Sequence, residues 1–93
     1  MPEFRVFETD EFLKSFKKLS SRDASFLRRK LDSFVYPQLK AAPFWGNNIK
    51  KLQGYTPETW RYRIGKYRVF YIVDQEEQIL YILTVDDRKD AYR

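Results

Sequence analysis

Residues 59–73 read TWRYRIGKYRVFYIV and carry the clearest structural pattern in the chain. Two runs in this stretch, 59–64 and 67–73, are rich in the aromatic and β-branched residues that are enriched in β-strands. Gly65-Lys66 between them has the length and the glycine of a two-residue turn. The stretch therefore predicts a β-hairpin.

The pattern on either side of this hairpin predicts the remaining elements. Period-two alternation and short apolar runs indicate strands at about 3–8, 49–52 and 79–85. Between the first two of these, apolar residues recur every three or four positions, which predicts two helices joined at a Ser20-Ser21 turn. The order β-α-α-β-β-β-β then predicts an α+β fold, in which an N-terminal strand and a helical hairpin pack on an antiparallel sheet of about four to five strands.

Several details of this fold stay open. Thr9 or Asp10 can cap the first helix, and Ser20 or Ser21 can cap the second. Pro37 leaves the end of the second helix ambiguous. The last two strands are apolar on both faces, so we expect them at the centre of the sheet. The helices then cover one face, and the C-terminal tail or a partner protein covers the other.

The composition fits one domain that spans residues 1–93. Hydrophobic residues make up 43% of the chain and aromatic residues 18%, enough for a single core. No apolar run approaches the roughly 20 residues that cross a membrane. The charged residues 1–5 lack the apolar stretch of a signal peptide. We therefore expect a cytoplasmic protein without a membrane partner.

The residue types that are missing limit the chemistry. The chain has no cysteine and no histidine, which excludes disulfides, thiolate nucleophiles, cysteine–histidine zinc sites and the most common general base. The acidic residues show no spacing typical of a metal-binding loop, so we expect neither a metal nor another cofactor. Positive charge is concentrated instead: the net charge is +5, and residues 46–73 carry six basic side chains and one acidic one. Such a local field attracts polyanions.

Three arginines of the hairpin are expected to share one face. With a turn at Gly65-Lys66, Arg63 lies opposite Arg68. Arg61 lies on the same face as Arg63, because side chains alternate along a strand. Like charges that face each other destabilise a sheet by roughly 0.2–1 kcal/mol, so this arrangement calls for an anion. Either a carboxylate from elsewhere in the chain or the phosphate backbone of a nucleic acid fits.

Further candidates for RNA contact lie outside the strands of the hairpin. Tyr92 can stack on an exposed base or, alternatively, cover the sheet. Basic side chains that can touch phosphate, or simply be solvated, are Lys50, Lys51, Lys66, Lys89 and Arg93.

Three motifs in this order resemble the RelE/ParE toxin superfamily. They are Lys51-Leu52-x-Gly54, then Arg61-x-Arg63-Ile64-Gly65-x-Tyr67-Arg68-x-x-Tyr71, then Arg88-Lys89-Asp90-x-Tyr92-Arg93. Each motif alone is weak, but the three together, after a strand and a helical hairpin, are fairly specific.

The resemblance implies a microbial-RNase-like sheet and a toxin of a type II toxin–antitoxin system that a cognate antitoxin protein holds inactive. In the RelE branch it implies a metal-independent, ribosome-dependent endoribonuclease. Such an enzyme cleaves mRNA in the A site of the small ribosomal subunit, by attack of the ribose 2′-hydroxyl on the adjacent phosphate. A higher-order toxin–antitoxin complex, with operator DNA bound through the antitoxin, is part of the same expectation.

The resemblance also assigns catalytic positions. Arg61 and Arg63 stand where the RelE branch has two strand lysines, and Arg68 matches its Tyr-Arg arginine. Arg88 matches its C-terminal arginine, and Tyr92 matches its base-stacking tyrosine.

The sequence departs from that branch at the general base. Many members carry a histidine directly before the C-terminal arginine, where this chain has Asp87. Arginine is a poor proton shuttle, so Asp87 is the candidate base, or else a structural partner of Arg88 or Arg68. A ParE-like inhibitor of DNA gyrase and a catalytically inert relative that only binds its antitoxin are therefore the alternatives to an endoribonuclease.

Overall fold

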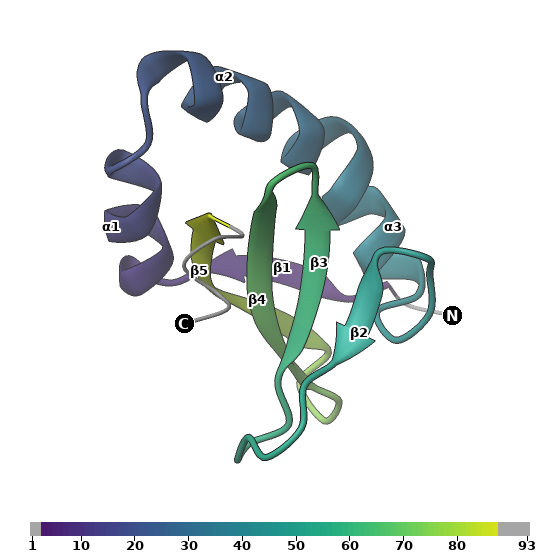
Figure 1. The fold of residues 1–93 in the computed structure, drawn as a ribbon. Coiled ribbons are helices and arrows are strands. Elements are labelled where there is room, and N and C mark those ends of the chain that lie inside the picture. The colour runs from purple at the N-terminus through teal and green to yellow at the C-terminus, as the bar shows by residue number, and fades with distance from the viewer. Residues whose placement is uncertain (1–2, 88–93) are drawn as a thin grey trace.

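A five-stranded sheet with helices over one side makes up residues 3–87, the part of the chain that the computed structural model describes (Figure 1). The strands lie in the order β1-β5-β4-β3-β2. This architecture confirms the predicted α+β class. The elements in chain order are β1 (Arg5–Glu8), α1 (Asp10–Lys17), α2 (Ser21–Lys30), the π-helical turn η1 (Leu31–Val35), α3 (Tyr36–Ala41), β2 (Ile49–Lys51), β3 (Trp60–Ile64), β4 (Tyr67–Asp74) and β5 (Ile79–Asp87).

The N-terminal strand makes the sheet mixed rather than purely antiparallel. β2, β3, β4 and β5 pair antiparallel in succession. β1 pairs parallel with β5, and Val6 is the partner of Leu80. Between β1 and β5 the chain forms the helices and then β2, β3 and β4, and a long connection of this kind permits parallel pairing. β1 therefore forms one edge of the sheet.

Side-chain caps begin both helices. The Thr9 hydroxyl accepts a hydrogen bond from the Phe12 N–H at 3.1 Å, and so caps α1. The Ser20 hydroxyl accepts one from the Asp23 N–H at 3.1 Å, and so caps α2. Each cap satisfies a backbone donor that has no partner within its helix. The caps are therefore Thr9 and Ser20 rather than the residues that follow them.

The second helix continues past Pro37. α2, η1 and α3 follow one another directly from residue 21 to residue 41. In the π-helical turn, the Tyr36 N–H donates to the Leu31 carbonyl. Proline lacks an N–H, and in a regular α-helix its ring crowds the carbonyl of the residue four positions earlier. The π-helical turn just before Pro37 changes the regular hydrogen-bond pattern at this point. Pro37 therefore does not end the helix.

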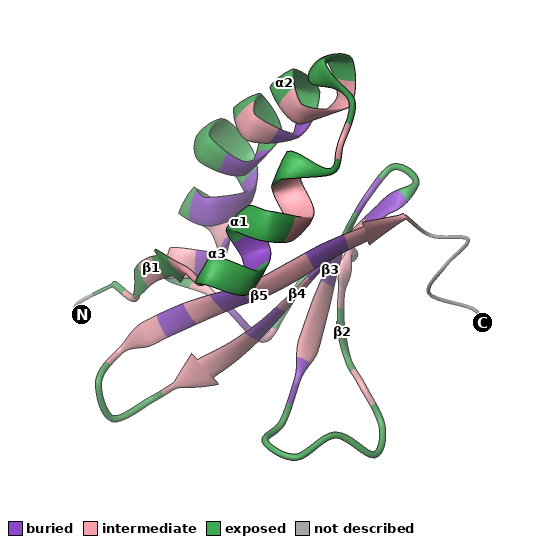
Figure 2. Cartoon of the chain, turned by 90° about the vertical axis from the view of Figure 1, so that its left-hand side faces the viewer, coloured by how far each residue is buried: buried purple, intermediate pink, exposed green. Residues whose placement is uncertain are grey.

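The core lies between the helices and one face of the sheet, and Figure 2 shows the helices gathered on that side. β4 and β5 lie in the interior of the sheet, as predicted. The other face was expected to be covered by the C-terminal tail or by a partner protein, and residues 88–93 of that tail lie outside the described residues. Among residues 3–87, no helix is long and apolar enough to cross a membrane. The buried hydrophobic residues are Phe12, Leu27, Leu31, Val35, Tyr36, Leu39, Tyr62, Ile64, Tyr67, Val69, Tyr71, Leu80, Ile82 and Val85.

Candidate nucleic-acid interface

The β3–β4 hairpin has the predicted register. Arg63 pairs with Arg68, and Arg61 pairs with Phe70. Tyr62, between the two arginines of β3, is buried in the core beneath the helices. Because successive side chains point to opposite faces, the three arginines leave the sheet on the face away from the helices.

The neighbouring strands add a lysine and a carboxylate to this face. Lys50 of β2 pairs with Arg61, and Asp86 of β5 pairs with Arg68. Side chains that lie directly opposite each other in a sheet share a face. We define the arginine face by these residues: Lys50, Arg61, Arg63, Arg68 and Asp86.

A backbone carbonyl positions one of these cations. Nη1 of Arg61 donates to the Asn48 carbonyl at 3.0 Å, and the Arg63 N–H donates to the same oxygen at 3.0 Å. Arg61 is half-buried, whereas the side chain of Arg63 is exposed. A side chain that is already ordered loses less conformational entropy when it binds a ligand. Arg61 is therefore prepared for an anion before one arrives.

A cavity of about 430 Å³ opens beside Arg68. Two aromatic residues, Tyr55 and Phe70, line it together with Arg68 and Asp86. Tyr55 is 58% exposed, so its ring is available for stacking. The sequence pattern singles out neither Tyr55 nor Asp86. Tyr55 lies in an irregular loop, and the place of Asp86 depends on the pairing of β4 with β5. The residues lining the cavity are Leu52, Tyr55, Thr59, Arg68, Phe70, Leu83, Thr84 and Asp86.

Two of the predicted RNA-binding lysines are paired with carboxylates. The Lys51 Nζ lies 3.1 Å from Oε2 of Glu58. Lys66, in the hairpin turn, has its Nζ 3.8 Å from Oδ2 of Asp23 and 3.9 Å from Oδ2 of Asp87. Neither lysine belongs to the arginine face, whereas Lys50 does. Their RNA contacts stay predictions.

Asp87, the candidate base from the sequence, lies next to the arginine face but not on it. It pairs with Tyr67, whose side chain is buried on the helix side of the sheet. Asp86 is the carboxylate that the structure brings to Arg68. The remaining predicted site residues, Arg88, Lys89, Tyr92 and Arg93, lie outside the described residues.

Two tyrosines on the helix side of the hairpin, Tyr67 and Tyr71, have raised pKa values. The Tyr67 hydroxyl donates to the Asp23 carboxylate, and burial together with this hydrogen bond raises the pKa of Tyr67 to about 12. Burial also raises the pKa of Tyr71, whose hydroxyl donates to the Pro43 carbonyl at 2.6 Å. Among the described residues, the arginine face thus offers permanent positive charge and one carboxylate.

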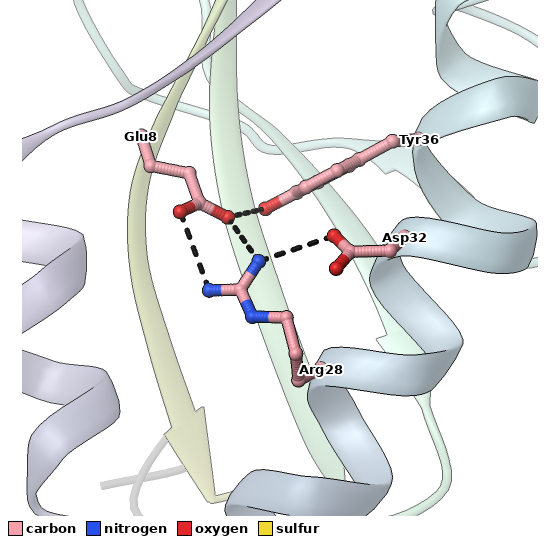
Figure 3. Close-up of polar contacts among 4 residues, drawn as sticks. All are labelled: Glu8, Arg28, Asp32 and Tyr36. Atoms are coloured by element: carbon pink, nitrogen blue, oxygen red, sulfur yellow. Dashed lines mark hydrogen bonds and ion pairs between the residues drawn. The ribbon is translucent and has the colours of Figure 1, made fainter.

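A separate polar cluster joins β1 to the second helix (Figure 3). Arg28 donates to both carboxylate oxygens of Glu8, at 2.8 and 3.3 Å, and to Asp32 at 3.2 Å. The Tyr36 hydroxyl donates to the same Glu8 carboxylate at 2.6 Å. Hydrogen bonding to Glu8 raises the pKa of Arg28, and burial raises the pKa of Tyr36. This cluster lies on the helix side and stabilises the fold.

Sequence comparison places the chain in a toxin family. Residues 6–92 match the family described as ParE toxin of type II toxin–antitoxin systems. The chain therefore belongs to this family, within the RelE/ParE superfamily of toxins. The match confirms the resemblance that the three sequence motifs indicated.

A curated relative agrees with this membership. The toxin candidate RelE1 of Methanocaldococcus jannaschii is 41% identical over 46 residues, which are 50% of this chain and 50% of that protein. The chain thus spans about half the length of this curated relative.

Solved structures show the same fold. The toxin–antitoxin complex RelBE2 from Mycobacterium tuberculosis contains a chain with a TM-score of 0.72 and 27% identity, and the match covers 95% of this chain and 100% of that one. The YoeB/ParE toxin from Agrobacterium tumefaciens has a TM-score of 0.70 at 20% identity, and the match covers 90% of this chain and 98% of that one. At 20% identity the likeness concerns the fold alone.

Proposed function

We propose that this toxin is a ribosome-dependent endoribonuclease that cleaves mRNA without a metal. The observation that carries the proposal is the placement of Lys50, Arg61, Arg63 and Arg68 on one face of the sheet. A row of cations on the side of the sheet opposite α1, α2 and α3 matches a polyanion whose phosphates repeat along a strand.

The chemistry that suits this face is attack of a ribose 2′-hydroxyl on the adjacent phosphate. The 2′-oxygen binds phosphorus as the bond from phosphorus to the 5′-oxygen breaks. The 2′-hydroxyl loses a proton and the leaving 5′-oxygen gains one, so the products are a 2′,3′-cyclic phosphate and a 5′-hydroxyl. That step builds negative charge on the phosphoryl oxygens, and cations that are already in position stabilise it. Arginine binds phosphate through a planar fork of N–H donors. In this proposal Arg61, Arg63 and Arg68 hold the scissile phosphate, and Arg88 and Tyr92 complete the site.

A carboxylate is the remaining requirement, because arginine does not exchange protons at neutral pH. The pairing of β4 with β5 favours Asp86 over Asp87 for this task, since Asp86 pairs with Arg68 and Asp87 lies 3.9 Å from Lys66. We assign Asp86 either proton transfer or the positioning of Arg68. Both roles require a carboxylate at this position.

The proposal includes a cognate antitoxin. The family is named for type II toxin–antitoxin systems, and the similar chain from Mycobacterium tuberculosis was solved in such a complex. We propose that the antitoxin holds this chain inactive in the cytoplasm, in a higher-order complex that binds operator DNA through the antitoxin. The targets of the released toxin are mRNA and the ribosomal A site.

Primer extension on mRNA in a translating extract tests the nuclease. Wild-type protein should produce cuts within codons that require ribosomes, and Arg68→Ala should abolish them. Arg22→Ala is the matched control, because Arg22 is an exposed arginine of α2. Intact mRNA with a folded, toxic wild-type protein would reject the proposal.

A second candidate, inhibition of DNA gyrase, is favoured by two observations. The family match over residues 6–92 is to ParE toxins, and the chain has no histidine to act as a general base. A supercoiling assay with purified gyrase separates this function from RNA cleavage. A chain with neither activity would be the catalytically inert relative that only binds its antitoxin.

A further inference from the structure

A groove separates the outer side of the second helix from the tip of the β3–β4 hairpin. Two aromatic side chains in it, Phe26 of α2 and Phe34 of η1, are 40% and 57% exposed. Phe26, Lys30 and Phe34 line two adjoining hollows of about 410 Å³ each. One hollow reaches Arg63 on the sheet, and the other reaches Arg29 on the outside of α2. Adjoining hollows with aromatic walls are typical of a binding surface.

The aromatic residues form one continuous stripe. Phe26, Lys30 and Phe34 follow one another at intervals of four residues, which keeps them on the same side of a helix. The Lys30 Nζ lies 5.5 Å from the centre of the Phe34 ring. This cation–π contact holds the Lys30 side chain against one of the two rings. An elongated segment, rather than a small molecule, fits a surface of this shape.

The rim of the groove is basic. Arg29, Lys30 and Arg63 are all exposed beside it. Asp32 is the acidic residue nearest to Lys30 in the sequence. Its carboxylate lies 3.2 Å from Nη1 of Arg28, in the cluster that joins β1 to the second helix. A segment that packs on Phe26 and Phe34 therefore has positive charge on both sides. Carboxylates on that segment would form favourable electrostatic contacts with these basic side chains.

We propose that this groove binds an acidic amphipathic segment of the antitoxin, and that binding removes Arg63 from the RNA site. Apolar residues of the segment pack on Phe26 and Phe34, and its carboxylates bind Arg29, Lys30 and Arg63. The inference rests on the proposed function, which supplies both the antitoxin and the RNA. Arg63 belongs to the groove and to the arginine face alike, so occupation of the groove competes with phosphate.

A second copy of the chain is a poorer occupant than an acidic segment. A symmetric dimer through this surface would bring the same basic rim of each copy against the other. Like charges that meet in an interface oppose association.

The test is calorimetric binding of the full chain to its purified cognate antitoxin. Phe26→Ser, Phe34→Ser and Lys30→Glu should each raise the Kd by at least about tenfold. Leu13→Ser is the control for Phe26→Ser, because both side chains are 40% exposed. Lys17→Glu is the control for Lys30→Glu, because each is an exposed lysine in the last turn of its helix. Both controls should keep the wild-type Kd.

The outcomes separate this inference from the nuclease proposal. A wild-type Kd in folded Phe34→Ser and Lys30→Glu overturns the groove, even if the chain cleaves mRNA. Weaker binding in these variants, with intact mRNA in the extract, keeps the groove and rejects the nuclease. A wild-type chain that does not bind the antitoxin, or a free dimer that Phe34→Ser dissociates, also overturns the inference. Circular dichroism checks that each variant is folded. If a phenylalanine variant unfolds, the Kd of Lys30→Glu decides the test, because the Lys30 side chain is exposed.

Discussion

Arg68 of β4 lies directly opposite Asp86 of β5, although an unbroken ladder from the Tyr71–Ile82 pair would place Val85 there. The register between the two strands shifts between Phe70 and Tyr71. A shift of one residue moves every later side chain to the other face of the sheet. The irregularity thus brings Asp86 to the arginine face and turns the next carboxylate to the helix side.

This relationship predicts different effects for two neighbouring carboxylates. Asp86→Asn should lower the single-turnover rate of mRNA cleavage by about 10- to 100-fold, because the carboxylate either moves a proton or positions Arg68. Asp87→Asn makes the same chemical change one residue later, on the side of Tyr67, and should leave the rate close to wild type. A larger loss in Asp87→Asn would show that the sequence-based choice of base was correct.

The opposed arginines predict that the loss of Arg63, a proposed RNA-binding residue, makes the fold more stable. Arg63→Thr should raise the free energy of unfolding by about 0.5 kcal/mol, because Arg68 no longer faces a like charge. The gain should shrink as salt screens the repulsion. Urea unfolding at low and high salt measures both effects. Arg5→Thr is the control, since Arg5 is an exposed strand arginine that pairs with Ile79. A less stable Arg63→Thr would mean that Arg63 makes a favourable contact in the folded chain.

The hairpin and its arginines were predictable because their geometry is local. A two-residue turn at Gly65 fixes which residues of β3 and β4 oppose each other, and alternation fixes their faces. The helical layer was predictable for a similar reason, because the spacing of apolar residues within a helix does not depend on distant partners.

The rest of the site depends on contacts between distant parts of the chain. The irregularity in β5 has no glycine or proline to mark it in the sequence, so alternation alone does not distinguish Asp86 from Asp87. Tyr55 lies in a loop without periodicity, and only the fold brings it to Arg68. The parallel pairing of β1 with β5 joins residues more than seventy positions apart, as in the Val6–Leu80 pair.

The cluster around Glu8 of β1 predicts that removing the Tyr36 hydroxyl group lowers the stability of the fold. Tyr36→Phe should lower the free energy of unfolding by about 1–2 kcal/mol, because the Glu8 carboxylate loses a hydrogen bond in a partly buried place. Tyr55→Phe is the control for the same chemical change at a side chain that is 58% exposed. Urea unfolding measures both variants. Tyr36→Phe should keep wild-type cleavage, because Tyr36 lies in α3, on the side of the sheet away from the arginine face. Equal stabilities of the two variants would contradict the role of the cluster.

The hydrogen bond of Tyr67 to Asp23 predicts how stability depends on alkaline pH. Burial and this bond raise the pKa of Tyr67 from 10.0 to about 12 in the folded chain. Between these values the unfolded chain releases the phenol proton while the folded chain keeps it. The folded state then binds more protons, so its stability falls as pH rises, whereas below pH 10.0 the contribution is fully present. The raised pKa values of Tyr36 and Tyr71 act in the same direction in every variant that keeps them.

Tyr67→Phe isolates this contribution, because phenylalanine has no proton to lose. At about pH 9 the wild type should be the more stable of the two, since it keeps the bond to Asp23. From about pH 9 to about pH 11 its free energy of unfolding should fall more steeply than that of Tyr67→Phe, so the difference between them shrinks. Urea unfolding at pH steps across this range gives both curves. Parallel curves would mean that the Tyr67 phenol has the same pKa in the folded and unfolded chains, and that the bond to Asp23 does not hold its proton.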